Sequence, residues 1–161
     1  PSLNLLHQDN NFLFTHAGVS DVFAYQLKDK GQDLLNATFR KLTADKDTLF
    51  DFYYSQASAA FRTKYRTKDA PFTPEGATAL RQAGINFVAH GHDSQTQGHK
   101  LRYIEDMPHL ACDVTVNSGS RCKENLGTQS GWGVAVFDPE KNHIRCFSPE
   151  ARTGFDWRLY T

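Results

Sequence analysis

The order of hydrophobic patterns along this chain of 161 residues predicts an α/β or α+β layered fold. Two short apolar runs, at 11–15 and 85–89, are each followed closely by histidine and glycine and read as buried strands. Between them, apolar residues recur every three or four positions, as in helices. After the second run, short alternating segments indicate a β meander. Such elements bury their apolar faces by packing in layers.

The helical segment runs from Asp21 to about Arg66. Glycine is a poor helix former, so Gly31 is expected to separate a first helix from a second. The polar residues at 43–46 are expected to separate the second helix from a third. The stretch at 63–71 is polar and basic, has no clear period and is interpreted as a loop.

A further helix is expected to begin at Thr73-Pro74-Glu75. Threonine is a good capping residue, proline suits the first helical position, and glutamate favours the positive end of a helix. Gly84 then marks the expected end of this helix. The second apolar run, Ile85 to Ala89, follows directly and is predicted to end at His90.

The rest of the chain is rich in predicted strands. Four segments have strand character: Lys100–Ile104, Ala111–Val116, Gly133–Phe137 and His143–Phe147. The polar run at 138–142 contains proline and asparagine and is predicted to form the turn between the last two. Because no repeat or linker divides the chain, residues 1–161 are expected to form a single domain.

The composition is that of an ordinary globular domain, with 39% hydrophobic and 22% charged residues. A formal net charge of zero gives no reason to expect binding to a nucleic-acid duplex or an anionic membrane. No apolar stretch approaches the roughly 20 residues of a membrane span. Three widely spaced cysteines argue against a disulfide framework and favour a reducing compartment. We therefore expect a cytoplasmic protein.

His16 and His92 stand out among the seven histidines because each lies beside glycine near the end of a predicted strand. Loops at such positions carry function in α/β folds, and glycine lets the backbone approach a ligand. Neutral imidazole is also a common metal ligand. His90 and His92 could place both rings on one side of an extended segment. Three others lack this context and are interpreted as ordinary histidines: His7, His109 and His143.

These motifs resemble those of the calcineurin-like metallophosphoesterases. "FLFTHAGVS" is similar to the family's "VHAG" motif, in the branch of serine/threonine protein phosphatases and bacterial diadenosine-tetraphosphatase-like enzymes. "INFVAHGHDSQTQGHKL" resembles the second histidine motif, with Gly98 six residues after His92. The helix "FTPEGATALRQAG" has its expected place, and "CDVTVNSGSRC" with "GWGVAVFD" looks like the terminal strand pair. The resemblance spans roughly residues 11–147 and implies the C-terminal part of a layered α-β-β-α sandwich.

The resemblance implies that His16 and His92 bind one ion of a dinuclear centre of manganese, iron or zinc. Two such ions, about 3.5–4 Å apart, clamp a phosphoryl group that a metal-bound hydroxide attacks. The implied reaction is hydrolysis of a phosphate ester or phosphoanhydride in a phosphoprotein or a dinucleotide polyphosphate. His90 remains an alternative ligand, because other members of the family use both histidines of a Gly-His-x-His motif. Here Ala89 precedes His90, and the spacing to Gly98 favours His92.

Two arginines are candidates for contact with substrate. In this branch, an arginine that contacts the substrate phosphate lies six residues before a phenylalanine, and Arg66 and Phe72 have this spacing. A guanidinium suits phosphate because it donates two parallel hydrogen bonds. A solvated basic loop is the alternative, given the neighbouring cations Arg62, Lys64 and Lys68. Arg121 falls near a position where the family often places a tyrosine beside the active site.

The acidic motifs of the family, Asp-x-His, Gly-Asp-x-x-Asp-Arg and Gly-Asn-His-Asp/Glu, are absent from this sequence. The chain also opens with Pro1, and its only methionine is Met107. We therefore expect the C-terminal portion of a metallophosphoesterase domain. Two histidines without the bridging aspartate make a poor site, so this chain alone should bind metal weakly or not at all and be inactive. We also expect it to associate with its missing N-terminal half or with itself.

Two other interpretations remain open. The chain could be a non-catalytic binding or assembly module that keeps the fold, which the absent acidic motifs favour and the retained histidines and glycines oppose. It could also hold a mononuclear zinc site formed by His16, His90 and His92, which would require His16 to lie within about 4 Å of the other two rings.

Overall fold

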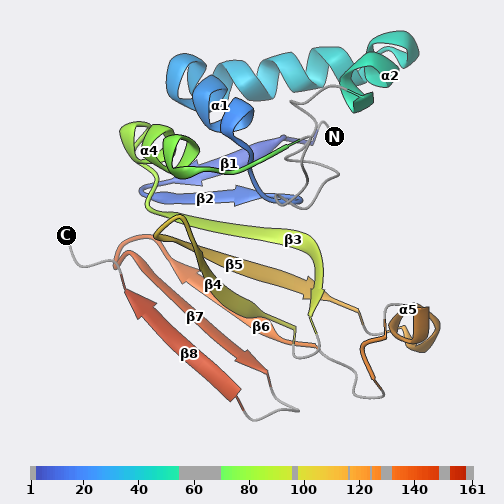
Figure 1. Ribbon diagram of the computed structural model, residues 1–161, viewed down its shortest axis with the longest axis vertical. Helices are drawn as coiled ribbons and strands as arrows, with labels where there is room; N and C mark the ends of the chain where they lie inside the picture. Colours follow the sequence, from blue (N-terminus) through green and yellow to red (C-terminus); the bar gives the residue numbers. More distant parts are fainter. Residues whose placement is uncertain are drawn as a thin grey trace.

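The computed structural model describes residues 3–54, 70–95, 98–115, 117–123, 125–127, 132–148 and 153–158. They form three layers, with helices on a five-stranded sheet and a three-stranded sheet beneath it (Figure 1). The helices are α1 (Asp21–Thr43), α2 (Lys46–Tyr54), α4 (Pro74–Gln82) and the short α5 (Ser118–Lys123). None of these helices is long and apolar enough to cross a bilayer. The mixed α/β class predicted from the sequence is confirmed.

The strands divide between two sheets. The larger sheet has the order β1 (Leu6–Asp9), β2 (Phe12–Thr15), β3 (Phe87–Gln95), β5 (Met107–Val114), β4 (Lys100–Ile104). The smaller, antiparallel sheet has the order β6 (Val134–Asp138), β7 (His143–Ser148), β8 (Thr153–Arg158). Because β2, β3 and β5 are parallel, their carboxyl ends meet at the right-hand end of the molecule in Figure 1.

Of the predicted β meander, the antiparallel pair β6–β7 is confirmed, and β8, which was not predicted, extends it. β4 and β5 instead form a hairpin that joins the larger sheet, where β5 runs parallel to β3. The segments that resemble a terminal strand pair belong to different sheets, since 107–114 is β5 and 134–138 is β6. The α-β-β-α layering implied by the resemblance is not confirmed, since none of the described helices covers the outer face of the smaller sheet (Figure 1).

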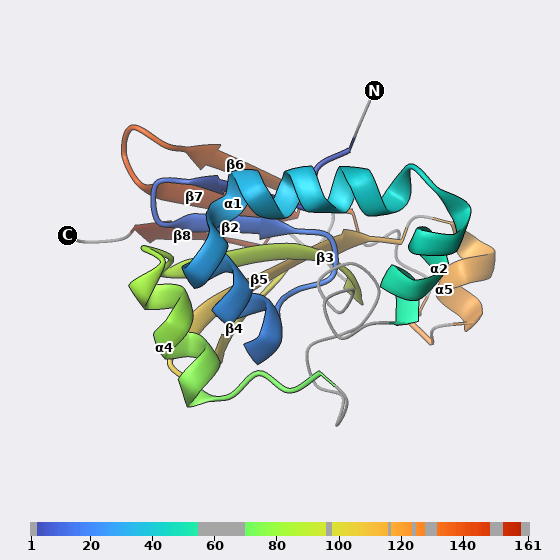
Figure 2. The ribbon, with the colours of Figure 1, turned by 90° about the horizontal axis from the view of Figure 1, so that it is seen from above.

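The helices cover one face of the larger sheet. Viewed from above, α1 lies over β2 and β3, and α4 lies beside it (Figure 2). Gly31 adopts a φ of 71° and kinks α1 where a break was expected. The buried side chains of this layer come from both helices and from the sheet: Leu13, Phe23, Leu27, Leu35, Phe39, Leu80, Val88 and Met107.

Asp21 joins the start of α1 to the start of α4. Its carboxylate accepts the backbone N–H of Thr73 at 2.8 Å and the Thr73 hydroxyl at 2.9 Å. Thr73 is the N-cap residue, as predicted, but its side chain does not cap its own helix. Gly76 permits this contact, because a Cβ at position 76 would lie only 2.0 Å from Asp21 Oδ1. Any side chain at that position would displace the carboxylate.

Aromatic rings fill the space between the two sheets. The ring of Phe12 is fully buried, with its centroid 5.1 Å from that of Phe87 and 4.4 Å from that of Phe137. Trp157 of β8 lies 4.5 Å from Phe87. Such tilted ring pairs add to the stabilisation that comes from burying their area. The same core includes Leu110, Cys112, Ile144 and Cys146.

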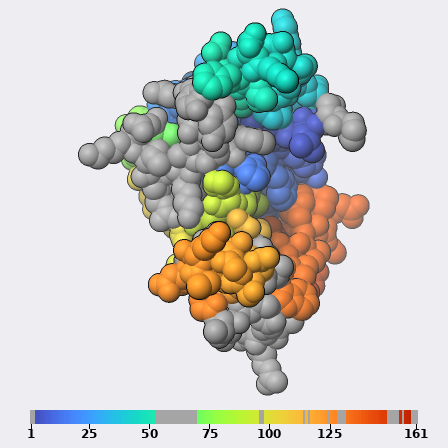
Figure 3. All heavy atoms as spheres, turned by 90° about the vertical axis from the view of Figure 1, so that its right-hand side faces the viewer, coloured from blue at the N-terminus to red at the C-terminus, as the bar shows by residue number. Residues whose placement is uncertain are grey.

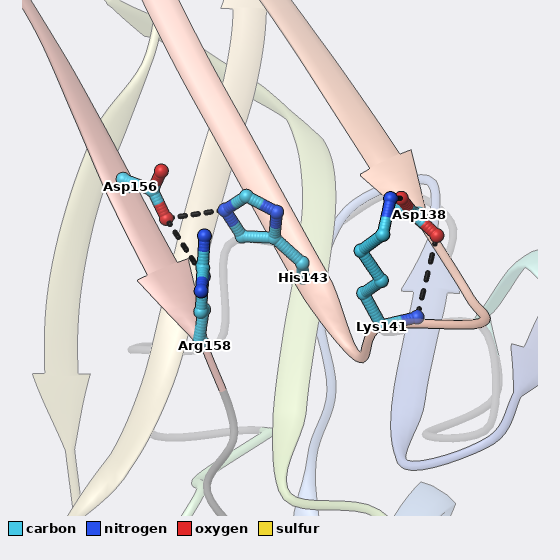
Figure 4. Close-up of polar contacts among 5 residues, drawn as sticks. All are labelled: Asp138, Lys141, His143, Asp156 and Arg158. Atoms are coloured by element: carbon cyan, nitrogen blue, oxygen red, sulfur yellow. Dashed lines mark hydrogen bonds and ion pairs between the residues drawn. The ribbon is translucent and has the colours of Figure 1, made fainter.

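Polar side chains form close contacts on the smaller sheet (Figure 4). The Nε2–H of the buried His143 donates to Asp156 Oδ1, and Nε of Arg158 lies 3.7 Å from the same oxygen. In the predicted turn between β6 and β7, Lys141 Nζ lies 2.9 Å from Asp138 Oδ2. The hydrogen bond from the Lys141 side chain helps to hold the pKa of Asp138 below its ordinary value. The contact of His143 links β7 to β8, and the contact of Lys141 closes the turn between β6 and β7.

We expect only Cys122 to react quickly with thiol reagents in the folded protein. Burial raises the pKa of Cys112 to about 11 and that of Cys146 to about 12, whereas Cys122 is exposed. Because the thiolate is the nucleophile, alkylation at pH 8 should be at least about a hundredfold slower at Cys112 and Cys146. Iodoacetamide labelling followed by peptide mass spectrometry measures the three rates. Equal rates in the native protein would contradict the raised pKa values of the partly buried Cys112 and the buried Cys146.

Candidate metal site

The parallel strands β2 and β3 bring His16 and His92 together. The backbone N–H of Gly91 donates to the His16 carbonyl at 2.9 Å, which joins the two segments. A Cβ at position 91 would lie 3.2 Å from that oxygen, so glycine suits this close approach. The rings of His16 and His92 are both exposed, with centroids 5.3 Å apart. Figure 3 faces this end and shows blue atoms that follow β2 beside yellow-green atoms of β3.

His16 lies in the short turn that connects β2 to α1. The Gly18 N–H donates to Thr15 Oγ1 at 3.1 Å, and Gly18 has a φ of 115° that favours glycine. Ser20 then caps α1, accepting the Phe23 N–H at 3.3 Å. The turn is therefore held at both ends, and His16 projects from it at the carboxyl end of a buried strand.

The prediction that this strand ends at His90 is wrong, because β3 continues to Gln95. Its register with β5 shifts between these residues, so that residues 91–93 of β3 stand opposite Cys112 alone. Within this bulge, His92 has a φ of 57°, a left-handed conformation that is uncommon for histidine. Bulges of this kind change the direction of a side chain and are frequent beside functional sites. The bulge therefore sets where the His92 ring lies.

The spacing of the two rings fits a shared metal ion. If each ligating nitrogen lies about 2.1 Å from an ion, each ring centre lies about 3.2 Å from it, and a tetrahedral angle puts the centres about 5.2 Å apart. The observed separation of the His16 and His92 centroids is 5.3 Å. Imidazole nitrogens are also suitable donors for zinc and iron. No group of three His, Cys, Asp or Glu side chains that could hold an ion occurs in the described ranges.

His90 takes a different position from the exposed pair. It is only 3% exposed, and its Nδ1–H donates to the Gly91 carbonyl at 2.8 Å. Since a carbonyl can only accept, Nδ1 carries the proton. The ring lies 6.3 Å from that of His109, whose pKa is lowered to about 3 by burial and by the neighbouring His90. Among the described residues, the three-histidine site left open by the sequence is not found.

The two candidate arginines have different outcomes. Arg66 lies outside the described residues. Arg121 is buried in α5, where Nη1 donates to the Thr115 carbonyl at 2.9 Å and Nη2 donates to the Leu126 carbonyl at 2.8 Å. Its guanidinium therefore bridges the two chain segments that flank α5.

Sequence reasoning missed two charged residues beside the histidine pair. Asp93 is buried, and its Oδ2 lies 3.0 Å from Nη1 of Arg102 in β4. An acidic residue directly after a His-Gly-His run is a signal that could have pointed to Asp93. Arg102 has no comparable local signal, because it reaches the site from the edge of the sheet.

No protein-family model, curated protein or solved structure matched this chain. What the site can do follows from its own residues. Two exposed imidazoles from adjacent parallel strands lie at a separation that one cation can bridge. A cation bound there would attract the anionic oxygens of a phosphate group.

Proposed function

We propose that this chain supplies a two-histidine part of the metal centre of a calcineurin-like metallophosphoesterase. The reaction is hydrolysis of a phosphate ester or phosphoanhydride, with a phosphoprotein or a dinucleotide polyphosphate as substrate. The proposal is carried by the 5.3 Å spacing of the exposed His16 and His92 rings at neighbouring parallel strands. Ligands of open α/β sheets bind at such carboxyl ends. The resemblance of both histidine motifs to the family gives further support.

Each residue of the site has a distinct role in this proposal. His16 and His92 hold one of two divalent ions of manganese, iron or zinc. Such ions supply Lewis-acid activation of water and neutralise charge on phosphoryl oxygens. Arg66, which lies outside the described residues, binds the substrate phosphate through parallel hydrogen bonds. His90 steadies the backbone between the two ligands through its hydrogen bond to the Gly91 carbonyl.

The other metal ligands are proposed to come from another polypeptide segment, either an N-terminal half of the domain that is not part of this sequence or a second copy of the chain. Metal centres generally use three or more protein ligands, and two histidines provide only two. A cavity of about 280 Å³ between the sheets, bordered by Thr15, His90 and Phe137, offers room for a side chain of that segment. Val136 and Phe147, each about half exposed on the smaller sheet, offer apolar contact area.

A non-catalytic binding or assembly module is the second candidate function. The observation that favours it is the absence from this sequence of the family's three acidic motifs. The close approach at Gly91 and the left-handed backbone at His92 oppose it, because neither is needed to assemble layers. A module of this kind would have no reason to bind a cation at His16 and His92 in preference to any other exposed histidine.

A zinc titration of the isolated chain tests the proposed site. Followed by NMR of the histidine side chains, the His16 and His92 signals should shift together and saturate only in the millimolar range, which corresponds to about 4 kcal/mol of binding free energy. Replacing either residue with glutamine should weaken binding at the other by about tenfold or more, because one ligand of a chelating pair is lost. The isolated chain should hydrolyse no phosphoester.

The matched control is His7→Gln, which removes an exposed histidine from β1 and should leave the titration unchanged. Equal zinc responses at His7, His16 and His92 would rule out the metal pair and favour the non-catalytic module. Tight stoichiometric binding by the isolated chain would instead contradict the part of the proposal that assigns further ligands to another segment.

A further inference from the structure

The β3 bulge is held on both sides of His92. On one side, the Gly91 N–H donates to the His16 carbonyl at 2.9 Å. On the other side, the Asp93 carboxylate lies 3.0 Å from Nη1 of Arg102. The side chain of His92 itself is exposed. The residue with the unusual backbone conformation therefore lies between two anchored neighbours.

Arg102 reaches Asp93 from two strands away. It belongs to the edge strand β4, and β5 lies between β4 and β3. The two side chains are only 23% and 12% exposed, so water screens their attraction less than that of a surface pair. The Asp93 carbonyl is also occupied, since it accepts a hydrogen bond from the side-chain amide of Gln95. Asp93 is thus fixed at its side chain and at its backbone.

We propose that the Arg102–Asp93 ion pair is the positioning device that holds His92 opposite His16. A left-handed histidine costs energy relative to the ordinary conformations and persists only where its surroundings enforce it. Asp93 is the next residue along the chain, so anchoring it restricts the backbone of His92. The inference rests on the proposed metal site, because binding an ion together with His16 is the reason that the position of the His92 ring matters.

Hydrogen exchange without metal provides the first test. In Arg102→Met, which keeps the length but removes the charge, the Gly91 amide should exchange at least about tenfold faster, because the bulge opens locally. Arg102→Lys should restore most of the protection, since it keeps the charge. Amides in the middle of β2 should exchange at unchanged rates, which separates local opening from a general loss of stability. Lys100→Met removes an exposed cation from the same strand and serves as the matched control.

The zinc titration provides the second test. Arg102→Met and Asp93→Asn should each weaken zinc binding at His16 and His92 by about tenfold, the lower end of the range for partners that orient metal ligands. The double variant should lose no more than either single variant, because both changes break the same contact. Arg102→Lys should bind zinc nearly as well as the wild type.

These two readouts separate the inference from the function on which it rests. Unchanged Gly91 exchange in Arg102→Met would overturn the positioning role, whatever the zinc affinity. Faster exchange with unchanged zinc binding would also overturn it, because the bulge would then not control the ligand. If the wild type shows no zinc response at His16 and His92, the proposed metal site fails, and the exchange data alone decide whether the ion pair holds the bulge.

Discussion

Replacing Phe12 with alanine should lower the free energy of unfolding by about 3–5 kcal/mol, the usual cost of removing a fully buried aromatic ring. Its centroid lies between 4.4 Å and 6.5 Å from those of four other aromatic side chains: Phe14, Phe87, Phe137 and Trp157. These neighbours come from both sheets, so the substitution removes contacts on which their packing depends. The hydrogen-bonded strands cannot move together far enough to close the resulting cavity. Urea denaturation followed by tryptophan fluorescence measures the change.

Phe147→Ala is the matched control, because this phenylalanine lies on the smaller sheet but is 47% exposed. Its removal should cost less than about 1 kcal/mol, as is usual for surface positions. An equal loss of unfolding free energy in Phe12→Ala and Phe147→Ala would mean that the packing of Phe12 between the two sheets does not stabilise the fold. The comparison also bears on the site, because β2 carries Phe12 at one end and leads directly to His16 at the other.

The elements that the sequence predicts well are those whose signals are local. Phe12 and Leu13 face opposite sides of a sheet that is covered on both faces, so β2 reads as a continuous apolar run. The start of α4 is equally local, since Thr73 and Pro74 supply the cap position and the first helical residue. His16 and His92 were identified as candidates for the same reason, as each lies within two residues of a glycine in a short motif.

The elements that sequence reasoning missed depend on distant partners. β1 contains few buried apolar residues, and its start is held by α1 instead. The backbone N–H groups of Leu5 and Leu6 donate to Asn36 Oδ1 at 2.9 Å and 3.1 Å, and the Asn36 amide donates back to the Leu6 carbonyl. A pattern within the strand cannot reveal a partner 30 residues away. β8 was missed for a similar reason, because its strand character depends on pairing with β7.

The same limit applies inside the candidate site. The bulge around His92 arises from the register between β3 and β5, which the sequence of β3 alone does not specify. The anchor of that bulge, Arg102, lies on a strand that does not touch β3 in the sheet order. Sequence reasoning therefore found the candidate ligands but not the contacts that orient them.

His109 should make the protein lose stability as the pH falls below about 6.5. The side chain is fully buried, and burial together with the neighbouring His90 lowers its pKa from 6.5 to about 3. Between pH 6.5 and about pH 3, the His109 side chain binds a proton in the unfolded chain but not in the folded protein. Stability is therefore fully present above pH 6.5 and decreases by about 1.4 kcal/mol for each unit of acidification, to a total approaching 5 kcal/mol near pH 3. Urea denaturation between pH 7.5 and pH 4.5 measures this slope.

The decisive comparison is between slopes rather than absolute stabilities. His109→Leu changes the packing against Phe72 at every pH, which shifts the absolute stability. It also removes the proton uptake of His109 on unfolding. The stability of this variant should therefore decline less steeply than that of the wild type, by about 1.4 kcal/mol per pH unit between pH 6 and pH 4.5. The range from pH 6 to pH 4.5 lies above the pKa values of most carboxylates, which limits their contribution to the slope of stability against pH. His7→Leu, at an exposed position, should keep the slope of the wild type. Parallel slopes for His109→Leu and the wild type would mean that the imidazole of His109 accepts a proton in the folded state. Because the ring is buried beside Phe72 and His90, this would require local opening of the fold.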